Sequence, residues 1–249
     1  MKENEMIFGI RAIIEAVKSD KQIDKIILKN DLQSELAKEL FTAIKGYSHI
    51  QVQRVPLERL NRYTHKNHQG AIAFVSQTTY QLVADIVPML YEQGKVPFFV
   101  ALDGITDVRK FGAIARTCEC GGVDALIIPV KGGVSVNADA VKTSAGALHT
   151  LPVCKESSLV SALKFIKKCG VRIVVASEKG EKNYTEANLH DPVAIVMGAE
   201  DKGVSPEVLR LCDEMVSIPI LGNISSLNVS VAAGIMIYEG VKQRMNQGE

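Results

Sequence analysis

The feature that most constrains the fold is a series of apolar runs that begins at Val96 and alternates with helical segments. Five runs have the composition of strands: VPFFVAL, DALIIPV, VRIVVAS, PVAIVMG and EMVSIPI. Between them the sequence predicts helices near residues 109–121, 138–148, 157–168 and 205–211. Continuous apolar strands separated by helices are typical of a parallel sheet covered on both faces. Ligands of such folds bind beyond the carboxyl ends of the strands.

The first 76 residues follow another pattern, in which strand-like runs alternate with amphipathic segments. Apolar residues recur at helical spacing in GIRAIIEAVKS and DLQSELAKELFTAIKG, whereas IDKIILKN, IQVQRV and GAIAFVS are strand-like. We therefore predict a small α/β domain over residues 1–76, a linker over residues 77–95 and a larger α/β domain over residues 96–249.

The charge balance and one polar loop indicate what the small domain contacts. Residues 1–76 contain 12 Lys and Arg and 9 Asp and Glu, whereas the rest of the chain contains 17 and 19. This modest basic excess agrees with a domain that faces RNA. The loop THKNHQG, residues 64–70, is either solvated or in contact with RNA phosphates and bases.

Several classes of protein are excluded by what the sequence lacks. No apolar run reaches the ~18 residues of a membrane span. Glu3, Glu5 and Arg11 surround only short apolar pieces, so we expect no signal peptide and a cytoplasmic protein. The conventional dinucleotide-binding and P-loop motifs do not occur. The five cysteines have no metal-ligand spacing, and we expect no metal.

Polar residues concentrate after three of the predicted strands. After the first strand comes ITDVRKFGAIARTCECGG, in which Asp107 is predicted to cap a helix that carries Arg109, Lys110 and Arg116. Arg116 lies among small apolar residues. It is either a structural ion-pair partner or a clamp for a phosphate or carboxylate.

The second and third polar segments follow later strands. In GAEDKGVSPEVLRLCDE, Gly198 and Gly203 bracket Glu200, which is either a solvated residue of an ordinary turn or part of a ligand site. In LGNISSLNVSVAAG, Ser225 or Ser226 is predicted to cap the last helix, with Asn228 in its first turn. Capping needs only one of these side chains, which indicates a further use for the others.

Together the three segments resemble, in order, spacing and content, the motifs of the SpoU branch of the SPOUT methyltransferases, which methylate ribose 2′-hydroxyls in RNA. The resemblance extends from Val96 to about Arg244. Residues 1–76, with FGIRAIIEAV and HQGAIAFV, are similar to the substrate-binding domain of this family. The resemblance implies a parallel α/β sheet whose carboxyl-terminal part forms a deep trefoil knot, and a homodimer.

The resemblance also implies the cofactor, S-adenosylmethionine (SAM), and the residues around it. The backbones of Gly198, Ile218 and Leu227 are expected to hold SAM.

The expected catalytic residues are Arg116, Glu200, Ser226 and Asn228. A ribose 2′-oxygen would attack the SAM methyl group in line with the leaving sulfur. Because a guanidinium has a pKa above ~12, we expect Arg116 to bind a flanking phosphate and stabilise developing charge rather than remove a proton.

The sequence departs from the family pattern at two positions. Lys110 stands where the family usually has Asn, and Val108 where it usually has Pro. A lysine supplies a donor but no acceptor. Since the four expected catalytic residues are retained, we expect an active enzyme.

The family offers several substrates. The size of the first domain favours ribosomal RNA, and we expect a guanosine of the large-subunit RNA. The alternatives are a transfer-RNA methyltransferase and an inactive RNA-binding or ribosome-assembly factor, for which Lys110 is the supporting feature. A small-molecule methyltransferase has no use for a dedicated domain of this size.

Overall fold

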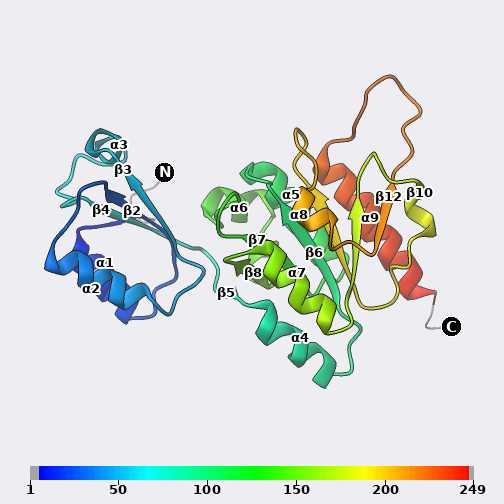
Figure 1. The fold of residues 1–249 in the computed structure, drawn as a ribbon, viewed down its shortest axis with the longest axis horizontal. Coiled ribbons are helices and arrows are strands. Elements are labelled where there is room, and N and C mark those ends of the chain that lie inside the picture. Colours follow the sequence, from blue (N-terminus) through cyan, green and yellow to red (C-terminus); the bar gives the residue numbers. More distant parts are fainter. Residues whose placement is uncertain (1–5, 247–249) are drawn as a thin grey trace. The chain divides into compact units, whose positions relative to one another are not determined.

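The computed structural model describes residues 6–246, which form two units (Figure 1). The smaller unit holds the described residues up to Thr79 together with Ser135–Asn137. The larger unit holds Tyr80–Val134 and the described chain from Ala138 onward. Within residues 6–246, no helix has the length and apolar character needed to cross a membrane.

The smaller unit is a four-stranded sheet with helices on both faces. In spatial order the strands are β1 (Met6–Phe8), β4 (Ala71–Val75), β2 (Ile23–Lys29) and β3 (Gln51–Val55). The helices are α1 (Ile10–Lys18), α2 (Glu35–Ile44) and α3 (Leu57–Asn61).

The alternation of apolar residues along β2 divides the core of this unit between the two faces of the sheet. Ile26 and Leu28 pack with the buried side chains of α1 and α2. Ile27 points to the opposite face, where it packs with Leu60 of α3 and with Ile72 of β4. Successive strand residues face opposite sides, so β2 serves both cores.

The polar loop after α3 is partly structural. His68 is buried: its ring accepts the Gly70 N–H at Nδ1, and its Nε2 lies 2.9 Å from Asn61 Oδ1. His65, Lys66 and Asn67 are exposed. Neither alternative for the loop therefore applies to His68, whereas its exposed neighbours are accessible to a partner.

The larger unit confirms the predicted parallel sheet. Its strand order is β10-β12-β9-β11-β6-β7-β8-β5, and every pairing is parallel. The strands are β5 (Tyr80–Gln81), β6 (Phe98–Asp103), β7 (Ala125–Pro129), β8 (Val153–Glu156), β9 (Arg172–Ala176), β10 (Lys182–Asn183), β11 (Val193–Gly198) and β12 (Glu214–Ser217).

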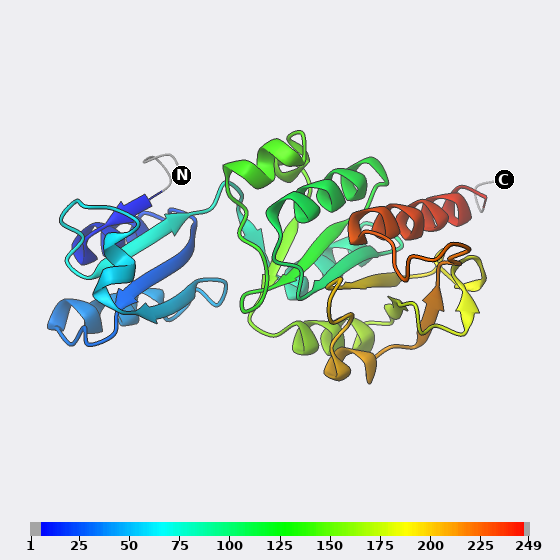
Figure 2. The same ribbon diagram turned by 90° about the horizontal axis from the view of Figure 1, so that it is seen from above.

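Helices cover both faces of this sheet (Figure 2). One layer contains α4 (Val83–Glu92), α7 (Leu159–Lys168) and α8 (Pro206–Leu209), whose apolar residues share a core with the strands. The other contains α5 (Val108–Cys120), α6 (Ala138–Thr143) and α9 (Val229–Met245). Two short 3₁₀ helices lie within the described part of this unit, η2 (Ala147–His149) and η3 (Tyr184–Glu186).

The segment 80–92, which the sequence analysis places in a linker, forms β5 and α4 of the larger unit. Val83, Ile86, Val87 and Leu90 are buried in the main core. Their spacing of three and four residues places them on one helix face. This stretch therefore gains its stability from burial against the sheet.

The carboxyl-terminal end of α9 is anchored to the beginning of β6 by Arg244. Its guanidinium donates to four backbone carbonyls, those of Leu189 (2.9 Å), Val96 (2.9 Å), Pro97 (3.1 Å) and Asp191 (2.8 Å). It also lies 4.4 Å from the centroid of the Phe98 ring. Only an arginine presents enough donors in a fixed plane to bind all four carbonyls.

We predict that Arg244→Met lowers the free energy of unfolding by about 2–3 kcal/mol, because several carbonyls lose their donor together. Urea unfolding followed by circular dichroism measures this change. Arg210→Met, at an exposed arginine of the same unit, is the control and should change the free energy by less than about 0.5 kcal/mol. Equal effects of the two substitutions would contradict the anchoring role.

Candidate active site

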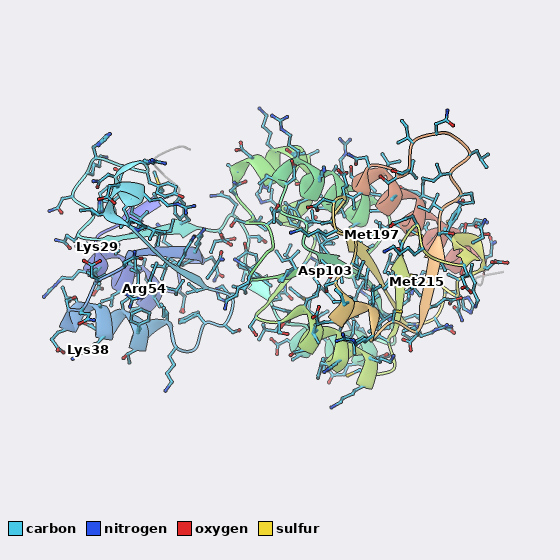
Figure 3. All side chains as sticks on the ribbon, turned by 45° about the horizontal axis from the view of Figure 1, so that its top comes forward. Lys29, Lys38, Arg54, Asp103, Met197 and Met215 are labelled. Atoms are coloured by element: carbon cyan, nitrogen blue, oxygen red, sulfur yellow. The ribbon has the colours of Figure 1, made fainter. Side chains whose placement is uncertain are left out.

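The carboxyl ends of neighbouring strands β6, β9 and β11 meet at one edge of the large sheet. Asp103 ends β6, and Met197 lies near the end of β11 (Figure 3). A cavity of about 330 Å³ lies at this edge. It is lined by residues 176–179 after β9, by 197–203 at the end of β11, by Ile218, Ile220 and 225–227 after β12, and by Val229 and Ala232 of α9.

Five of the seven residues predicted for the site line this cavity. They are the three predicted SAM-binding residues, Gly198, Ile218 and Leu227, and two of the predicted catalytic residues, Glu200 and Ser226. The structure therefore brings together the second and third polar segments, which are separate in the sequence.

Gly198 is required by the close approach of the turn that follows β11. A Cβ atom at this position would lie 2.3 Å from the carbonyl carbon of Gly203 and 2.3 Å from the Val204 nitrogen. The turn is closed by the Gly203 N–H, which donates to the Ala199 carbonyl at 2.7 Å. Asp103 holds the next residues, because its carboxylate accepts the Ser205 N–H at 2.7 Å. The cavity wall is thus built from backbone packed against backbone.

Glu200 connects this turn to two helices. One carboxylate oxygen accepts the Val229 N–H, at the start of α9, at 3.0 Å. The other forms an ion pair with the Lys110 ammonium of α5. The hydrogen bond from Lys110, followed by that from Val229, lowers the pKa of Glu200 below its ordinary value. Glu200 is therefore ionised at neutral pH. Its side chain is 34% exposed.

Asn228 begins α9 as its N-cap. Its side-chain oxygen accepts the Ser230 N–H at 2.9 Å, and its backbone is not helical. The prediction that Ser225 or Ser226 caps this helix, with Asn228 in the first turn, is therefore wrong. The helix begins later in the chain, and the two serines instead line the cavity.

Asp107 caps α5 as predicted. Its carboxylate accepts the backbone N–H groups of Arg109 (2.8 Å) and Lys110 (3.0 Å), which lowers the pKa of Asp107. The cap belongs to a second cavity of about 200 Å³, lined by residues 104–107, Lys110, 199–201 and Val229. Glu200 lines both cavities. The Lys110–Glu200 pair thus lies where the two cavities adjoin.

Arg116 is not among the residues that line either cavity. Its side chain is exposed on α5, and it forms no ion pair with another residue of the range 6–246. The interpretation of Arg116 as a structural ion-pair partner is therefore wrong for the described part of the chain. Its guanidinium is accessible to an external anion.

The sequence analysis missed the contribution of the segment after β9. Residues 176–179, Ala-Ser-Glu-Lys, line the larger cavity. Ala176 and Ser177 end the predicted strand VRIVVAS, and Glu178 and Lys179 follow it directly. The rule that ligands bind at the carboxyl ends of parallel strands was a sufficient signal to include them.

The residues that line the larger cavity fit a cofactor with an apolar ring system and charged groups of both signs. Ile218, Ile220 and Leu227 provide apolar surface, and the Gly198 turn allows a ligand to approach the backbone. Glu178 and Asp201 place carboxylates around the same space, Lys179 and Lys202 add ammonium groups, and Glu200 is paired with Lys110. Both signs of charge thus border the cavity, which suits a cofactor such as SAM that carries a carboxylate, an ammonium and a sulfonium group.

Fold and site thus define an α/β enzyme with a ligand cavity at the carboxyl edge of a parallel sheet. Family models identify which one. The SpoU rRNA methylase family model matches residues 97–238, and the model for RNA 2′-O ribose methyltransferase substrate binding matches residues 6–81. The chain belongs to the SpoU rRNA methylase family, which uses SAM to methylate ribose 2′-hydroxyls of RNA.

Similar proteins match this chain over its whole length. The 23S rRNA (guanosine-2′-O-)-methyltransferase RlmB of Shewanella oneidensis is 34% identical, covering 98% of this chain and 99% of the relative. A putative TrmH family tRNA/rRNA methyltransferase of Staphylococcus saprophyticus is 31% identical and covers 99% of both chains.

Solved structures share the fold. The A. aeolicus TrmH/SpoU tRNA modifying enzyme has a TM-score of 0.56 at 30% identity, over 67% of this chain and 86% of that one. The SpoU methyltransferase AviRb from Streptomyces viridochromogenes, in complex with AdoMet, has a TM-score of 0.61 at 24% identity, over 97% and 90%.

We predict that Gly198→Ala weakens SAM binding at least about tenfold, because the new methyl group displaces the turn that forms the cavity wall. Isothermal titration calorimetry measures the affinity. Gly222→Ala is the matched control, since a Cβ atom there has no neighbour within 4 Å. An unchanged SAM affinity in Gly198→Ala would exclude this turn from the cofactor site.

Proposed function

We propose that this chain transfers the methyl group of SAM to the ribose 2′-hydroxyl of a guanosine in large-subunit ribosomal RNA. The observation that carries the proposal is the cavity that brings together Gly198, Glu200, Ser226 and Leu227 at the sheet edge. Full-length similarity to RlmB proteins, which are named for this reaction on 23S ribosomal RNA, supports the choice of substrate.

The residues of the larger cavity would hold SAM. The backbones at Gly198, Ile218 and Leu227 would bind its polar edges, and the Ile218 and Leu227 side chains would cover its apolar ring. When bound, SAM supplies a methyl group on a positively charged sulfur, which is an activated leaving group. The protein must then position the acceptor oxygen and exclude competing nucleophiles.

Arg116 would bind the RNA phosphate next to the acceptor ribose. Its exposed guanidinium, which has no ion-pair partner within residues 6–246, suits the bidentate binding of a phosphate. In this role it would also stabilise charge that develops on the ribose oxygen. The hydroxyl proton would leave to water, since a guanidinium retains its own protons.

Glu200, Ser226 and Asn228 would shape the acceptor side of the site. The Glu200 carboxylate is already bound to Lys110 and to the Val229 N–H, so we assign it the positioning of α9 and of the adjoining loop. Asn228 is fixed by capping α9, and Ser226 faces the larger cavity. Both side chains would hydrogen-bond the ribose or the cofactor.

Lys110 supports an active enzyme. Its ammonium is neutralised by Glu200, and it connects α5 to the cavity wall. A lysine at this position thus has a defined structural use in an intact site. The inactive RNA-binding factor remains the alternative that Lys110→Asn tests below.

Transfer RNA is the second candidate substrate. The A. aeolicus tRNA modifying enzyme favours it, whereas relatives named as tRNA/rRNA methyltransferases fit either substrate. That enzyme, however, covers only 67% of this chain, whereas the RlmB of S. oneidensis covers 98%. The additional unit at the amino terminus therefore favours ribosomal RNA, which would place the activity in the cytoplasm.

The first test is the transfer of labelled methyl from SAM to unmodified total RNA separated by size. We predict label in large ribosomal RNA and a loss of about 100-fold or more in kcat/KM for Arg116→Ala, with the SAM affinity unchanged. Arg210→Ala is the control at another exposed arginine.

Other outcomes of this assay separate the alternatives. Label in transfer RNA alone would identify transfer RNA, in place of ribosomal RNA, as the substrate. RNA that is labelled only by the Lys110→Asn variant would show that Lys110 impairs the site of the natural chain. An absence of both label and SAM binding would overturn the enzyme proposal and leave an RNA-binding factor.

The proposal includes a homodimer. On α9, Val231, Tyr238 and Met245 are 52%, 51% and 72% exposed and recur every seven residues, on one helix face. In the loop before α9, Leu221 and Ile224 are 99% and 77% exposed. Exposed apolar side chains that recur on one helix face are typical of a protein contact. Membership of the family likewise supports the trefoil knot and a methyltransferase domain over residues 96–249.

We predict a dimer in sedimentation equilibrium and a shift toward monomer for Tyr238→Lys, because a charge would be buried at the contact. Met89→Lys, at an apolar side chain of α4 that is 42% exposed, is the matched control and should leave the assembly unchanged. A wild-type chain that is monomeric at high concentration would contradict the homodimer.

A further inference from the structure

The sheet of the smaller unit has one face that its helices only partly cover. α1 and α2 pack on the first face, whereas the second receives α3, a helix of five residues. On this second face lie Phe8 of β1 and Phe74 of β4, both half-buried, and Lys25 of β2. Lys25 is paired with Phe74 across the strands, so both side chains point to the same side.

The aromatic rings of this face lie beside one another and beside a cation. The rings of Phe74 and Tyr63 have their centroids 5.4 Å apart at an interplanar angle of 72°. The Lys66 ammonium lies 5.5 Å from the centroid of the Phe8 ring. Tyr63 is also half-buried. The face therefore presents aromatic surface together with positive charge.

Further polar groups surround the rings. Gln51 and Gln53 of the edge strand β3 are paired with Lys25 and Ile27, and so lie on the same face. Their amides can donate and accept hydrogen bonds. From α3 to Gly70 the chain carries three basic residues, Arg59, Arg62 and Lys66, and one acidic residue, Glu58.

We propose that this face, formed by Phe8, Lys25, Tyr63 and Phe74, binds unpaired bases of the RNA substrate by stacking. Aromatic rings on an open sheet stack splayed bases, neighbouring cations bind the phosphates, and amides hydrogen-bond the base edges. The inference deepens the proposed function and rests on it. It defines the recognised element as a single-stranded loop or bulge of the substrate RNA.

The chemistry of the face selects RNA over a protein partner. The centres of protein interfaces are depleted of lysine, whereas this face has Lys25 beside Phe74 and Lys66 over Phe8. A duplex would not fit either, because its bases are already stacked and paired. Positive charge combined with partly buried rings that keep some exposed surface matches a single strand with bases turned outward.

The test uses the full chain and a short single-stranded oligoribonucleotide that carries 2-aminopurine, whose fluorescence is quenched by stacking. Phe8→Leu and Phe74→Leu keep apolar volume but remove the ring. We expect quenching by the wild type, and for each variant reduced quenching and a Kd raised at least about fivefold. The same RNA as a duplex should bind more weakly and show no change in fluorescence.

Phe41→Leu is the matched control. Phe41 is a ring of the same unit, on α2, 38% exposed and 5.6 Å from the Arg54 guanidinium. Its removal should leave the Kd within twofold. Thermal unfolding of each variant identifies any loss of fold, and a misfolded variant is replaced by Lys66→Gln, for which we expect a weaker salt dependence of binding.

Methyl transfer separates this inference from the proposed function. The ring variants should raise the KM for RNA and leave the SAM affinity unchanged. If the wild type methylates RNA but the ring variants bind it normally, the stacking face is wrong and the proposed function stands. Equal affinity for duplex and single strand, or ring variants that alter only self-association, would also overturn the inference. A wild type without methyl transfer that still quenches the probe would count against the proposed function alone.

Discussion

The carboxylate of Glu200 joins the three parts of the chain on which the site depends. It is held by the Lys110 ammonium from α5 and by the Val229 N–H at the start of α9, while its own backbone belongs to the turn after β11. The turn is closely packed because Gly198, which has no Cβ atom, lets two backbone segments come into contact. A displacement of any one of these segments therefore changes the cavity wall that the other two complete. The ion pair also lies where the two cavities adjoin. Glu200 therefore forms part of the wall of both the larger and the smaller cavity.

Helices cover the sheets of the two units to different extents, and this difference determines which surface of each unit is open to a ligand. In the larger unit helices cover both faces, so only the strand ends are open to a ligand. In the smaller unit α1 and α2 cover one face, and the other keeps partly buried rings beside lysines. Catalysis at a strand edge and recognition on a sheet face are compatible with this division.

Much of the fold could be predicted from local pattern. The five apolar runs correspond to β6, β7, β9, β11 and β12, and Asp107 caps α5 as its position before the helix predicts. Other features could not be predicted in this way. β8 has only four residues, which is too short for a clear strand pattern. The sequence analysis places β5 and α4 in a linker because their apolar residues are buried only once they pack against the sheet. His68 belongs to a segment whose composition is that of a solvated loop. Its ring is nevertheless buried and hydrogen-bonded to the Gly70 N–H and to Asn61.

By itself the sequence determined the periods of helix and strand, the parallel character of the sheet, the three polar segments, and through their resemblance the family. Tertiary structure alone decided which polar groups meet. Lys110 and Glu200 are 90 residues apart, and Glu200 and Val229 are 29 apart. They come together because β11 lies beside β6 and the chain returns as α9 over the same edge. Local periodicity does not encode strand order. The cap at Asn228 and the outward position of Arg116 therefore followed only from the assembled fold.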